Sequence, residues 1–351
     1  MNKIAVDVMG GDYAPVEIVK GAILAVRELQ IPVVLVGDEA QIHPILKEEN
    51  MENHPLIEVH HASEVIEMGE HPSMAFRKKR DASVSVGARL VKSGECGALV
   101  APGSTGAAVT AGLLGIGRIS GIARPAILTP IPNEKGGYTF LIDSGASTVP
   151  KVETLWQNAI LGYIYAKQVY HMECPKIGLL NIGTEDTKGS AVVTEAFEKL
   201  SNQDVIPFAG NAEGRDIMSG KFDVIVTDGF TGNVVLKFGE GAVNLFRKLL
   251  KDAVTKGGLR AKIGALLLKP FLKKYFVKRL DYSEYGGAPL MGIRGGLMIC
   301  HGASKAWAIR NAIRMAKNYC DGAVPQTVME TLLKIEGGTD SAKRKTESDD
   351  K

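Results

Sequence analysis

Short, continuous apolar runs recur along the chain and alternate with longer segments of helical periodicity. The predicted strands are Ile4–Val8, Pro32–Gly37, Ile57–His60, Ala98–Ala101, Tyr138–Asp143, Lys176–Asn181, Val205–Ala209, Phe222–Thr227 and Leu297–His301. Most of these runs are continuous rather than alternating, which favours strands buried on both faces of a mainly parallel sheet. Amphipathic segments between them, such as Val16–Leu29, Ser83–Lys92, Val152–Tyr170 and Ala191–Leu200, predict helices. The pattern therefore predicts right-handed βαβ units in a doubly wound, layered α/β fold.

The pattern changes after Asp228, where a glycine-rich turn precedes a predicted helix at Val234–Val254 and a basic segment. A second glycine-rich stretch, "YGGAPLMGIRGG", leads into the last strand and a helix at Ser304–Asn318. We expect one α/β domain over residues 1–336, in which two lobes would be intimately joined. The tail 337–351 lacks apolar residues and is expected to be disordered.

Several classes of protein lack support in the sequence. The four cysteines form no CxxC pair and the seven histidines form no HxxxH or HExxH arrangement, so no metal is expected. The stretch "GGDYAP" lacks the GxGxxG spacing of a dinucleotide loop, no GxxxxGK[ST] is present, and no cofactor is expected. The N-terminus lacks the features of a signal peptide and no window approaches ~20 apolar residues, so a cytoplasmic protein is expected.

Five predicted strands end in polar, glycine-containing turns. They are "DVMGGD" after the first strand, "APGSTGA" at 101–107, "DSGAS" at 143–147, "NIGTEDTKG" at 181–189 and "TDGFTGN" at 227–233. In an open parallel sheet the carboxyl ends of the strands share one edge, where ligands bind. We therefore expect a single site at that edge, against the alternative of ordinary turn chemistry.

These turns resemble the bacterial PlsX family, the acyl-carrier-protein:phosphate acyltransferases. The resemblance rests on "IAVDVMGGDYAP", "PGSTGA", "NIGTEDTKG", "FAGNAEGRD", "VIVTDGFTGNVVLK" and "YGGAPLMG", in order, from about residue 3 to residue 320. Two positions depart from the family pattern, because Ser104 and Ser147 stand where Asn is common.

The resemblance implies transfer of a long acyl group from acyl carrier protein to inorganic phosphate, giving acyl phosphate for phospholipid synthesis. It implies a three-layer α/β/α fold related to isopropylmalate dehydrogenases and phosphate acetyltransferases. It also implies a homodimer, peripheral attachment to the membrane and an association with the downstream glycerol-3-phosphate acyltransferase.

This reaction needs modest catalysis, because a thioester is already activated and a thiol of pKa near 8.5 leaves readily. Phosphate is itself the nucleophile, so the protein must supply an anion site, an oxyanion hole and orientation. The candidate cations are Lys188, Arg215 and Lys237, each of which could instead be a solvated or ion-paired helix residue. The candidate backbone donors are the Gly10–Gly11 turn and the turn that contains Gly229, Thr231 and Gly232.

The remaining polar candidates each have a structural alternative. Asn211 and Asn233 would orient the carbonyl or phosphate, or would cap turns through their own backbone. Ser104 and Thr105 precede a helix predicted to begin at Gly106, so N-capping competes with phosphate contact. His301 is the candidate proton shuttle, with a structural hydrogen bond as the alternative. The strand-end acids Asp7, Asp12, Asp143 and Asp228 are expected to hold loops and orient lysines, because carboxylates repel phosphate.

The segment 253–281 is basic and apolar, with eight basic residues and no acidic residue between Asp252 and Asp281. Leu259, Ile263, Leu266 and Leu267 share one helical face, and Pro270 is expected in the first turn of a second helix. We expect a hairpin that lies on an anionic membrane through Leu266, Leu267, Leu268, Phe271, Leu272 and Phe276. A dimerisation hairpin is the alternative.

Acyl carrier protein, acidic as a family, could dock on this segment or on Arg77, Lys78, Lys79 and Arg80. Nucleic acid is not expected as a partner, because the basic cluster lacks stacking aromatics in a groove. The leading hypothesis is an acyl-thioester:phosphate acyltransferase. A short-chain phosphate acetyltransferase that uses coenzyme A and a non-catalytic membrane scaffold are the alternatives.

Overall fold

A computed structural model describes residues 2–272, 275, 279 and 281–335. The strands are β1 (Lys3–Asp7), β2 (Val33–Gly37), β3 (Ile57–His61), β4 (Cys96–Pro102), β5 (Ala126–Pro132), β6 (Tyr138–Ile142), β7 (Ile177–Leu180), β8 (Phe208–Ala212), β9 (Val224–Val226), β10 (Ala288–Met291) and β11 (Gly296–Cys300). The helices are α1 (Val16–Leu29), α2 (Glu39–Glu48), α3 (Pro72–Lys78), α4 (Ser83–Ser93), α5 (Thr105–Thr110), η1 (Ala111–Ile116), α6 (Val152–Tyr170), α7 (Ala191–Ser201), η2 (Gly214–Met218), α8 (Gly229–Lys256), α9 (Gly258–Leu272), η5 (Tyr282–Glu284) and α10 (Ala306–Asp321), and residues 324–335 are also helical.

The strands form one 11-stranded sheet in the order β3-β2-β1-β4-β11-β10-β5-β6-β9-β7-β8. Seven neighbouring pairs are parallel, whereas β11–β10, β10–β5 and β5–β6 are antiparallel. The sheet is therefore mixed and mostly parallel, which confirms the predicted fold class. Because three antiparallel steps separate β11 from β6, the strands β6, β9, β7 and β8 run opposite to β1, β4 and β11.

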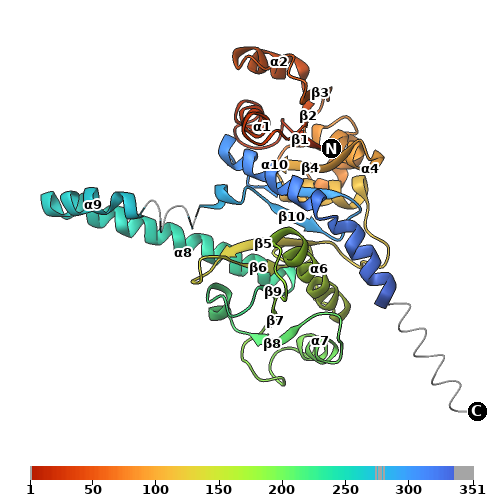
Figure 1. Cartoon of the computed structure of the whole chain (residues 1–351), viewed down its shortest axis with the longest axis vertical. Coiled ribbons are helices and arrows are strands. Elements are labelled where there is room, and N and C mark those ends of the chain that lie inside the picture. The colour runs from red at the N-terminus through yellow and green to blue at the C-terminus, as the bar shows by residue number, and fades with distance from the viewer. Residues whose placement is uncertain (1, 273–274, 276–278, 280, 336–351) are drawn as a thin grey trace, which may run out of the picture.

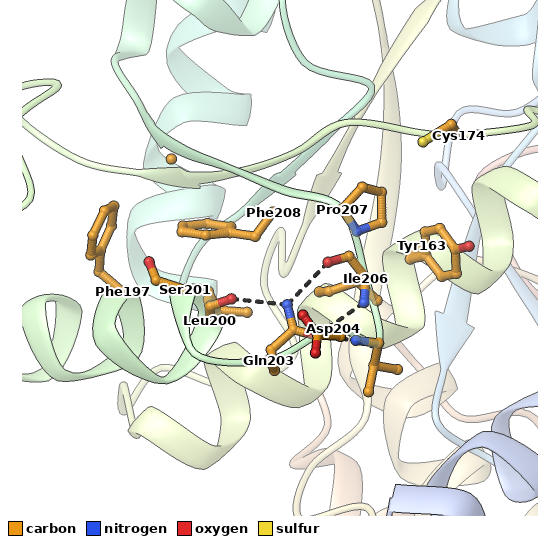
Figure 2. A pocket seen from close by; sticks show the side chains of 12 residues that line it. Tyr163, Cys174, Phe197, Leu200, Ser201, Gln203, Asp204, Ile206, Pro207 and Phe208 are labelled. Atoms are coloured by element: carbon orange, nitrogen blue, oxygen red, sulfur yellow. Dashed lines mark hydrogen bonds between the residues drawn. The ribbon is translucent and has the colours of Figure 1, made fainter.

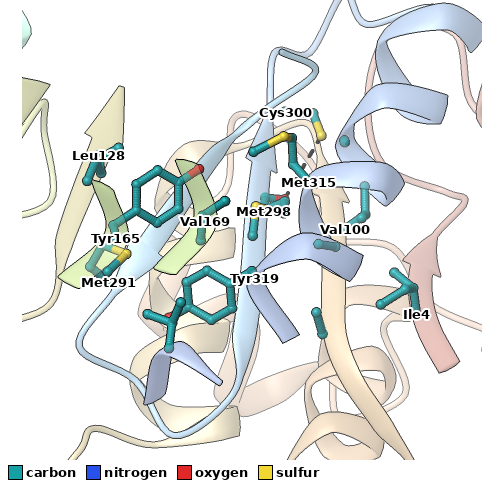
Figure 3. Close-up of a cluster of buried hydrophobic side chains, with 14 of the residues drawn as sticks. Ile4, Val100, Leu128, Tyr165, Val169, Met291, Met298, Cys300, Met315 and Tyr319 are labelled. Carbon is teal, nitrogen blue, oxygen red and sulfur yellow. Dashed lines mark hydrogen bonds between the residues drawn. The ribbon is translucent and has the colours of Figure 1, made fainter. Parts of the chain in front are cut away.

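Side chains that alternate along the strands point into two different layers of core. In β1, Ile4 and Val6 join the larger core while Ala5 faces the opposite side. The larger core also receives side chains from α1, α2, α6 and α10, and Figure 3 shows Tyr165 of α6 beside the strand residues Leu128 and Met291, with Tyr319 of α10 in the same cluster. Helices α4 and α5 cover the other face. Helices thus flank both faces of the sheet, which gives three layers.

Strand prediction succeeded at most positions and failed at two. The predicted helices at Val16–Leu29 and Val152–Tyr170 match α1 and α6. The strand predicted at Val205–Ala209 lies three residues later, as β8. β5 and β10 were not predicted. Both contain proline, which sequence reasoning takes as a sign against a strand.

Two helices, α8 and α9, pack on each other and extend away from the sheet (Figure 1). Helix α8 has 28 residues, begins five residues earlier than Val234, and buries Gly229 and Gly232. The hairpin consists of α8 and α9 and is not the predicted one inside residues 253–281, because residue 253 lies in α8 and residues 258–272 form a single helix. Pro270 lies inside α9 instead of opening a new helix, so that expectation was wrong. Phe276 and the tail 337–351 lie outside the described residues.

Candidate functional site

The predicted turns fall into two groups instead of along one parallel edge. The loops after β1, β4 and β11 form the first group, and the loops after β6, β7, β8 and β9 form the second group. The expectation of a shared edge was wrong, because it assumed that no antiparallel step separates these strands.

In the first group, close backbone packing explains the glycines of the "MGGD" turn. A Cβ on Gly10 would lie 2.2 Å from the carbonyl oxygen of Pro102, and Gly11 has a φ of +92°. The amide of Asp12 donates to the carbonyl of Gly302 at 2.8 Å, and the amide of Met9 donates to a carboxylate oxygen of Asp7 at 3.2 Å. These contacts join the loops after β1, β4 and β11 without any ligand.

Asp7 is the buried acid of the first group. Its side chain hydrogen-bonds Ser83 at the start of α4, and burial raises the pKa of the Asp7 carboxyl to about 6. Ser83 carries no motif in the sequence, so its role was not predicted. Asp7 holds the loop, as expected of the strand-end acids.

The polar candidates of the first group have defined local roles. Ser104 caps α5, because its Oγ accepts from the amide of Ala107 at 3.3 Å, and Thr105 is the exposed first residue of that helix. This confirms capping for Ser104. The exposed His301 accepts a bond at Nδ1 from the amide of Ala303 at 3.0 Å, so a neutral ring carries its proton on Nε2.

Sequence reasoning also missed Lys305, a cation of the first group. Lys305 is exposed, and its ammonium lies 5.1 Å from the ring centroid of Tyr13, which follows Asp12. The lysine stands four residues after His301 in a segment that was predicted only as the start of a helix.

In the second group, Asp143 fills a ring of backbone donors. Its Oδ1 accepts from the amides of Ile127, Gly145 and Ala146 at 3.1, 2.9 and 2.8 Å, and its Oδ2 accepts from Ser147 at 2.8 Å. Burial raises the pKa of Asp143, although these bonds act in the opposite direction. The carboxylate thus occupies the anion position of the "DSGAS" loop.

Asp228 similarly occupies the start of α8. Its Oδ1 accepts from the amides of Phe230 and Thr231, both at 3.0 Å, and its Oδ2 accepts from the hydroxyl of Thr231 at 2.7 Å. The amide of Gly229 donates to Ser147, and the amide of Gly232 donates to Asp228. The expectation that Gly229, Thr231 and Gly232 supply donors to phosphate was therefore wrong, because their amides already have acceptors.

The glycines at the start of α8 instead permit close packing. A Cβ on Gly232 would lie 1.9 Å from the carbonyl oxygen of Asp143, and one on Gly229 would lie 2.4 Å from that of Ser147. Helix α8 therefore rests directly on the loop after β6.

Lys188 lies in a loop that two asparagines organise. Asn181 Nδ2 donates to the carbonyl of Lys188 and Asn211 Nδ2 donates to the carbonyl of Glu185, both at 2.8 Å. Asn211 therefore braces this loop, and its buried Oδ1 has no hydrogen-bond partner. The side chain of Lys188 is exposed, so its charge is accessible.

The other cations of the second group are exposed and paired with neighbouring acids. Arg215 contacts Glu213, and Lys237 lies 2.8 Å from Glu240 in the next turn of α8. Exposed pairs of this kind are worth about 0.2–1 kcal/mol, which is too little to prevent either cation from binding an anion. Asn233 is exposed, and its side chain faces Gly145.

Two cavities differ in their relation to these loops. One cavity, of about 600 Å³, lies between α6 and α7 beside the amino end of β8 (Figure 2). There the side-chain nitrogen of Gln203 donates to backbone carbonyls and its side-chain oxygen accepts from backbone amides. Its lining holds one charged residue, Asp204. A second cavity of about 270 Å³ lies in the first group and includes Asp7 and Gly10. The smaller cavity is therefore the one at the candidate site.

Within the described part of the chain, no group of three or more His, Cys, Asp or Glu residues could hold a metal ion. None of the described helices has the length and apolar character required to cross a bilayer.

A family model described as "Fatty acid synthesis protein" matches residues 2–327. The chain belongs to this family, the PlsX family. Relatives within it are named "Phosphate acyltransferase". The one from Pelotomaculum thermopropionicum is 48% identical over 95% of this chain and 96% of its own length, and the one from Heliobacterium modesticaldum is 52% identical over 90% and 93%. Membership of the PlsX family makes the chain a phosphate acyltransferase, with phosphate as a substrate.

Solved structures share the architecture of this PlsX family member. A phosphotransacetylase from Streptococcus pyogenes superposes with a TM-score of 0.58 at 17% identity, covering 90% of this chain and 94% of its own. A branched-chain phosphotransacylase from Enterococcus faecalis V583 gives 0.52 at 15% identity, covering 91% and 99%. At these identities the similarity shows the fold.

Proposed function

We propose that the chain transfers a long-chain acyl group from the thioester of acyl carrier protein to inorganic phosphate, giving acyl phosphate and the free carrier thiol. The observation that carries this proposal is the name "Phosphate acyltransferase" shared by relatives 48% and 52% identical over nearly the whole chain. The acyl phosphate would supply phospholipid synthesis by passing to the downstream glycerol-3-phosphate acyltransferase.

Sheet twist supports a common cleft for the two groups of loops. Six steps lead from β1 to β9, and at roughly 20–25° per step the strands rotate by about 120–150°. Since β1 and β9 run in opposite directions, this rotation leaves their carboxyl ends diverging by only about 30–60°. Both groups would then face one side of the molecule, with phosphate and thioester between them.

The second group would hold phosphate through side chains, because its backbone donors are occupied. Lys188 supplies an accessible charge, and Asn233 supplies an amide beside the loop after β6. Arg215 and Lys237 would exchange their weak surface pairs for the dianion. Asn211 would act by positioning the loop of Lys188.

The chemistry is direct displacement at the thioester carbon. A phosphate oxygen forms the new C–O bond, the C–S bond breaks, and the proton lost by phosphate ends on the thiol. The Nε2–H of His301 would donate a hydrogen bond to the leaving sulfur, because its Nδ1 accepts from the amide of Ala303 and the neutral ring has no free lone pair to take up the proton. Lys305 would stabilise the negative charge that develops on the carbonyl oxygen.

A basic surface next to the first group would receive the acidic carrier. Arg77, Lys78 and Arg80 are exposed near the end of α3, whereas Lys79 is occupied by Glu70 at 2.6 Å and the carbonyl of Val65 at 2.7 Å. Opposite charge on the carrier would steer its approach.

The test measures phosphate-dependent thiol release from hexadecanoyl-acyl carrier protein, hexadecanoyl-CoA and acetyl-CoA, with the acyl phosphate trapped by hydroxylamine. We expect turnover with the long-chain carrier thioester. Lys188→Ala should lower it by roughly 100-fold or more, as expected when one electrostatic contact to the reacting group is lost. Lys92→Ala, on the exposed end of α4, is the control and should stay near the parent rate.

Turnover of acetyl-CoA alone would contradict the proposal. It would favour the short-chain phosphate acetyltransferase, which the similarity to phosphotransacetylase structures supports.

We also propose that the α8–α9 hairpin joins two copies of the chain and rests on an anionic membrane. Phe238, Leu245 and Leu249 of α8 are exposed, and a helix of this length gains most of its stability from packing. In α9, Leu266, Leu267, Leu268 and Phe271 are 55–71% exposed and Leu272 is half-buried, while the charged residues of α9 are all basic. An apolar stripe with cationic flanks is typical of interfacial helices.

Vesicle flotation tests the membrane contact. The double variant Leu266→Glu and Leu267→Glu should lose flotation with vesicles containing an anionic phospholipid while keeping turnover in solution. Leu333→Glu, an exposed leucine on another helix, is the control. Unchanged flotation of the double variant would contradict the membrane contact, and a monomer in light scattering of the parent would contradict the second copy.

A further inference from the structure

The cavity of about 270 Å³ in the first group is lined by both apolar and acidic side chains. It lies between the loop after β1, the loop after β4 and residues 65–68, and its volume is near the lower limit of roughly 300 Å³ for ligand pockets. Its apolar lining includes Met9, Val65, Ile66, Met68, Val84 and Ala108. These side chains come from four separate segments, so the cavity is a product of the tertiary fold.

The charges around this cavity all have one sign. Asp7, Asp12 and Glu67 line it, and its lining contains no Lys, Arg or His. An ionised phosphate would meet carboxylates here without any cation to offset the repulsion. The expectation that Gly10, Gly11 and Ser104 bind phosphate therefore lacks electrostatic support, and an uncharged ligand suits the cavity better than phosphate.

The polar groups at the floor of the cavity already have protein partners. The Asp7 carboxyl is 4% exposed and bonds the amide of Met9 and the hydroxyl of Ser83. Its raised pKa reflects the desolvated surroundings. Apolar side chains outnumber polar ones in the lining, while polar atoms provide the larger share of its surface.

The outer wall is held in place by polar contacts outside the cavity. Lys79 bonds the carbonyl of Val65, and a Cβ on Gly302 would lie 2.4 Å from the terminal methyl of Met68. Gly302 directly follows His301, so the wall adjoins the residue proposed to contact the leaving sulfur. A chain that filled the cavity would emerge beside these residues.

We propose that this cavity receives the methylene chain of the acyl group and thereby selects acyl length. The inference rests on the proposed function for the identity of the chain. An apolar chain gains free energy where it leaves water for the apolar side chains of the lining, and the three carboxylates disfavour a charged head group among them, so that this group stays at the mouth. The carbonyl end would remain at the mouth, next to His301 and the loop after β1.

The test changes the volume at Ile66, which is half-buried and lines the cavity. Ile66→Trp should lower the ratio of kcat/KM for hexadecanoyl- over butanoyl-acyl carrier protein by about ten-fold or more, the scale on which pockets discriminate by size. Ile66→Ala should raise this ratio and provides the second variant if the tryptophan impairs folding. Leu114→Trp, an exposed residue of η1 outside the lining, should leave the ratio within about two-fold.

Equilibrium binding of cis-parinaric acid, followed by its fluorescence, separates this inference from the proposed function. Weaker binding to Ile66→Trp, with no effect of Leu114→Trp, supports the cavity even if no thioester is turned over. In that case the proposed function fails and an apolar-chain site remains. If hexadecanoyl transfer proceeds while both Ile66 variants keep the parent's chain-length ratio and affinity, the proposed function stands and the cavity inference is overturned.

Discussion

Asp7 and Asp143 occupy equivalent places in the two halves of the molecule, but their surroundings differ. Each is a buried aspartate at the carboxyl end of a strand, next to a loop with glycine. Asp143 accepts four backbone hydrogen bonds, whereas the Asp7 carboxyl accepts backbone bonds from Met9 and Gly10. Asp7 also borders a cavity, and α8 rests on the loop of Asp143.

This difference indicates two uses of the same residue. A carboxylate that saturates its loop makes a rigid support, and the second group can then expose side chains such as Lys188. The Asp7 carboxyl has fewer backbone donors around it, and a cavity lies on one side of it. The comparison predicts that Asp143 contributes mainly to stability and that Asp7 makes stability depend on pH.

The largest expected effect is that of Asp143→Ala. The substitution leaves four backbone amides without their acceptor and should lower the free energy of unfolding by about 3–5 kcal/mol. Asp143→Asn keeps one acceptor oxygen and should lose less. Urea denaturation measures both, and losses below about 1 kcal/mol for the alanine variant would show that the loop does not depend on this carboxylate.

A smaller effect is expected from Asp7→Asn, and it depends on pH. The folded-state pKa of about 6 lies above the ordinary value of 3.8, so between these values the native chain holds a proton that the unfolded chain has lost. The free energy of unfolding therefore falls as pH rises through this window, by about 3 kcal/mol for a shift of this size. The asparagine variant lacks this loss.

Urea unfolding at pH 4 and pH 7 checks that prediction. Relative to the parent, Asp7→Asn should gain about 2.4 kcal/mol between the two pH values. If the difference in unfolding free energy between variant and parent stays the same at both pH values, Asp7 is not desolvated as the structure indicates. Asp7 and Asp143 would then differ less in their surroundings.

The sequence predicted most elements but not the direction in which half of them run. Apolar runs and helical periodicity located α1, α6 and nine of the eleven strands, because burial imposes these patterns locally. β5 contains Pro130 and Pro132, and β10 contains Pro289, so both failed as strand candidates. Missing them removed the antiparallel steps and placed all five turns at one edge.

The glycine turns show a second limit of sequence reasoning. Glycine near the start of a helix suits both phosphate binding and close backbone packing, and the amino-acid sequence alone does not distinguish these two roles. At Gly232 the carbonyl of Asp143 leaves no room for a Cβ, which is a contact between segments 89 residues apart. The exposed Lys188, in contrast, was identified correctly as part of a loop, because "NIGTEDTKG" marks a turn without tertiary information.

The attachment of α8 has a mechanical consequence. At 28 residues the helix is about 42 Å long, and its buried residues are the two glycines of its first turn. The helix is therefore held at its first turn, on the loop of Asp143, and its far end carries α9. A displacement of several ångströms at the far end of α8 would move its first turn by a small fraction of that distance. The loops of the second group can thus keep their geometry while the far end follows whatever it touches.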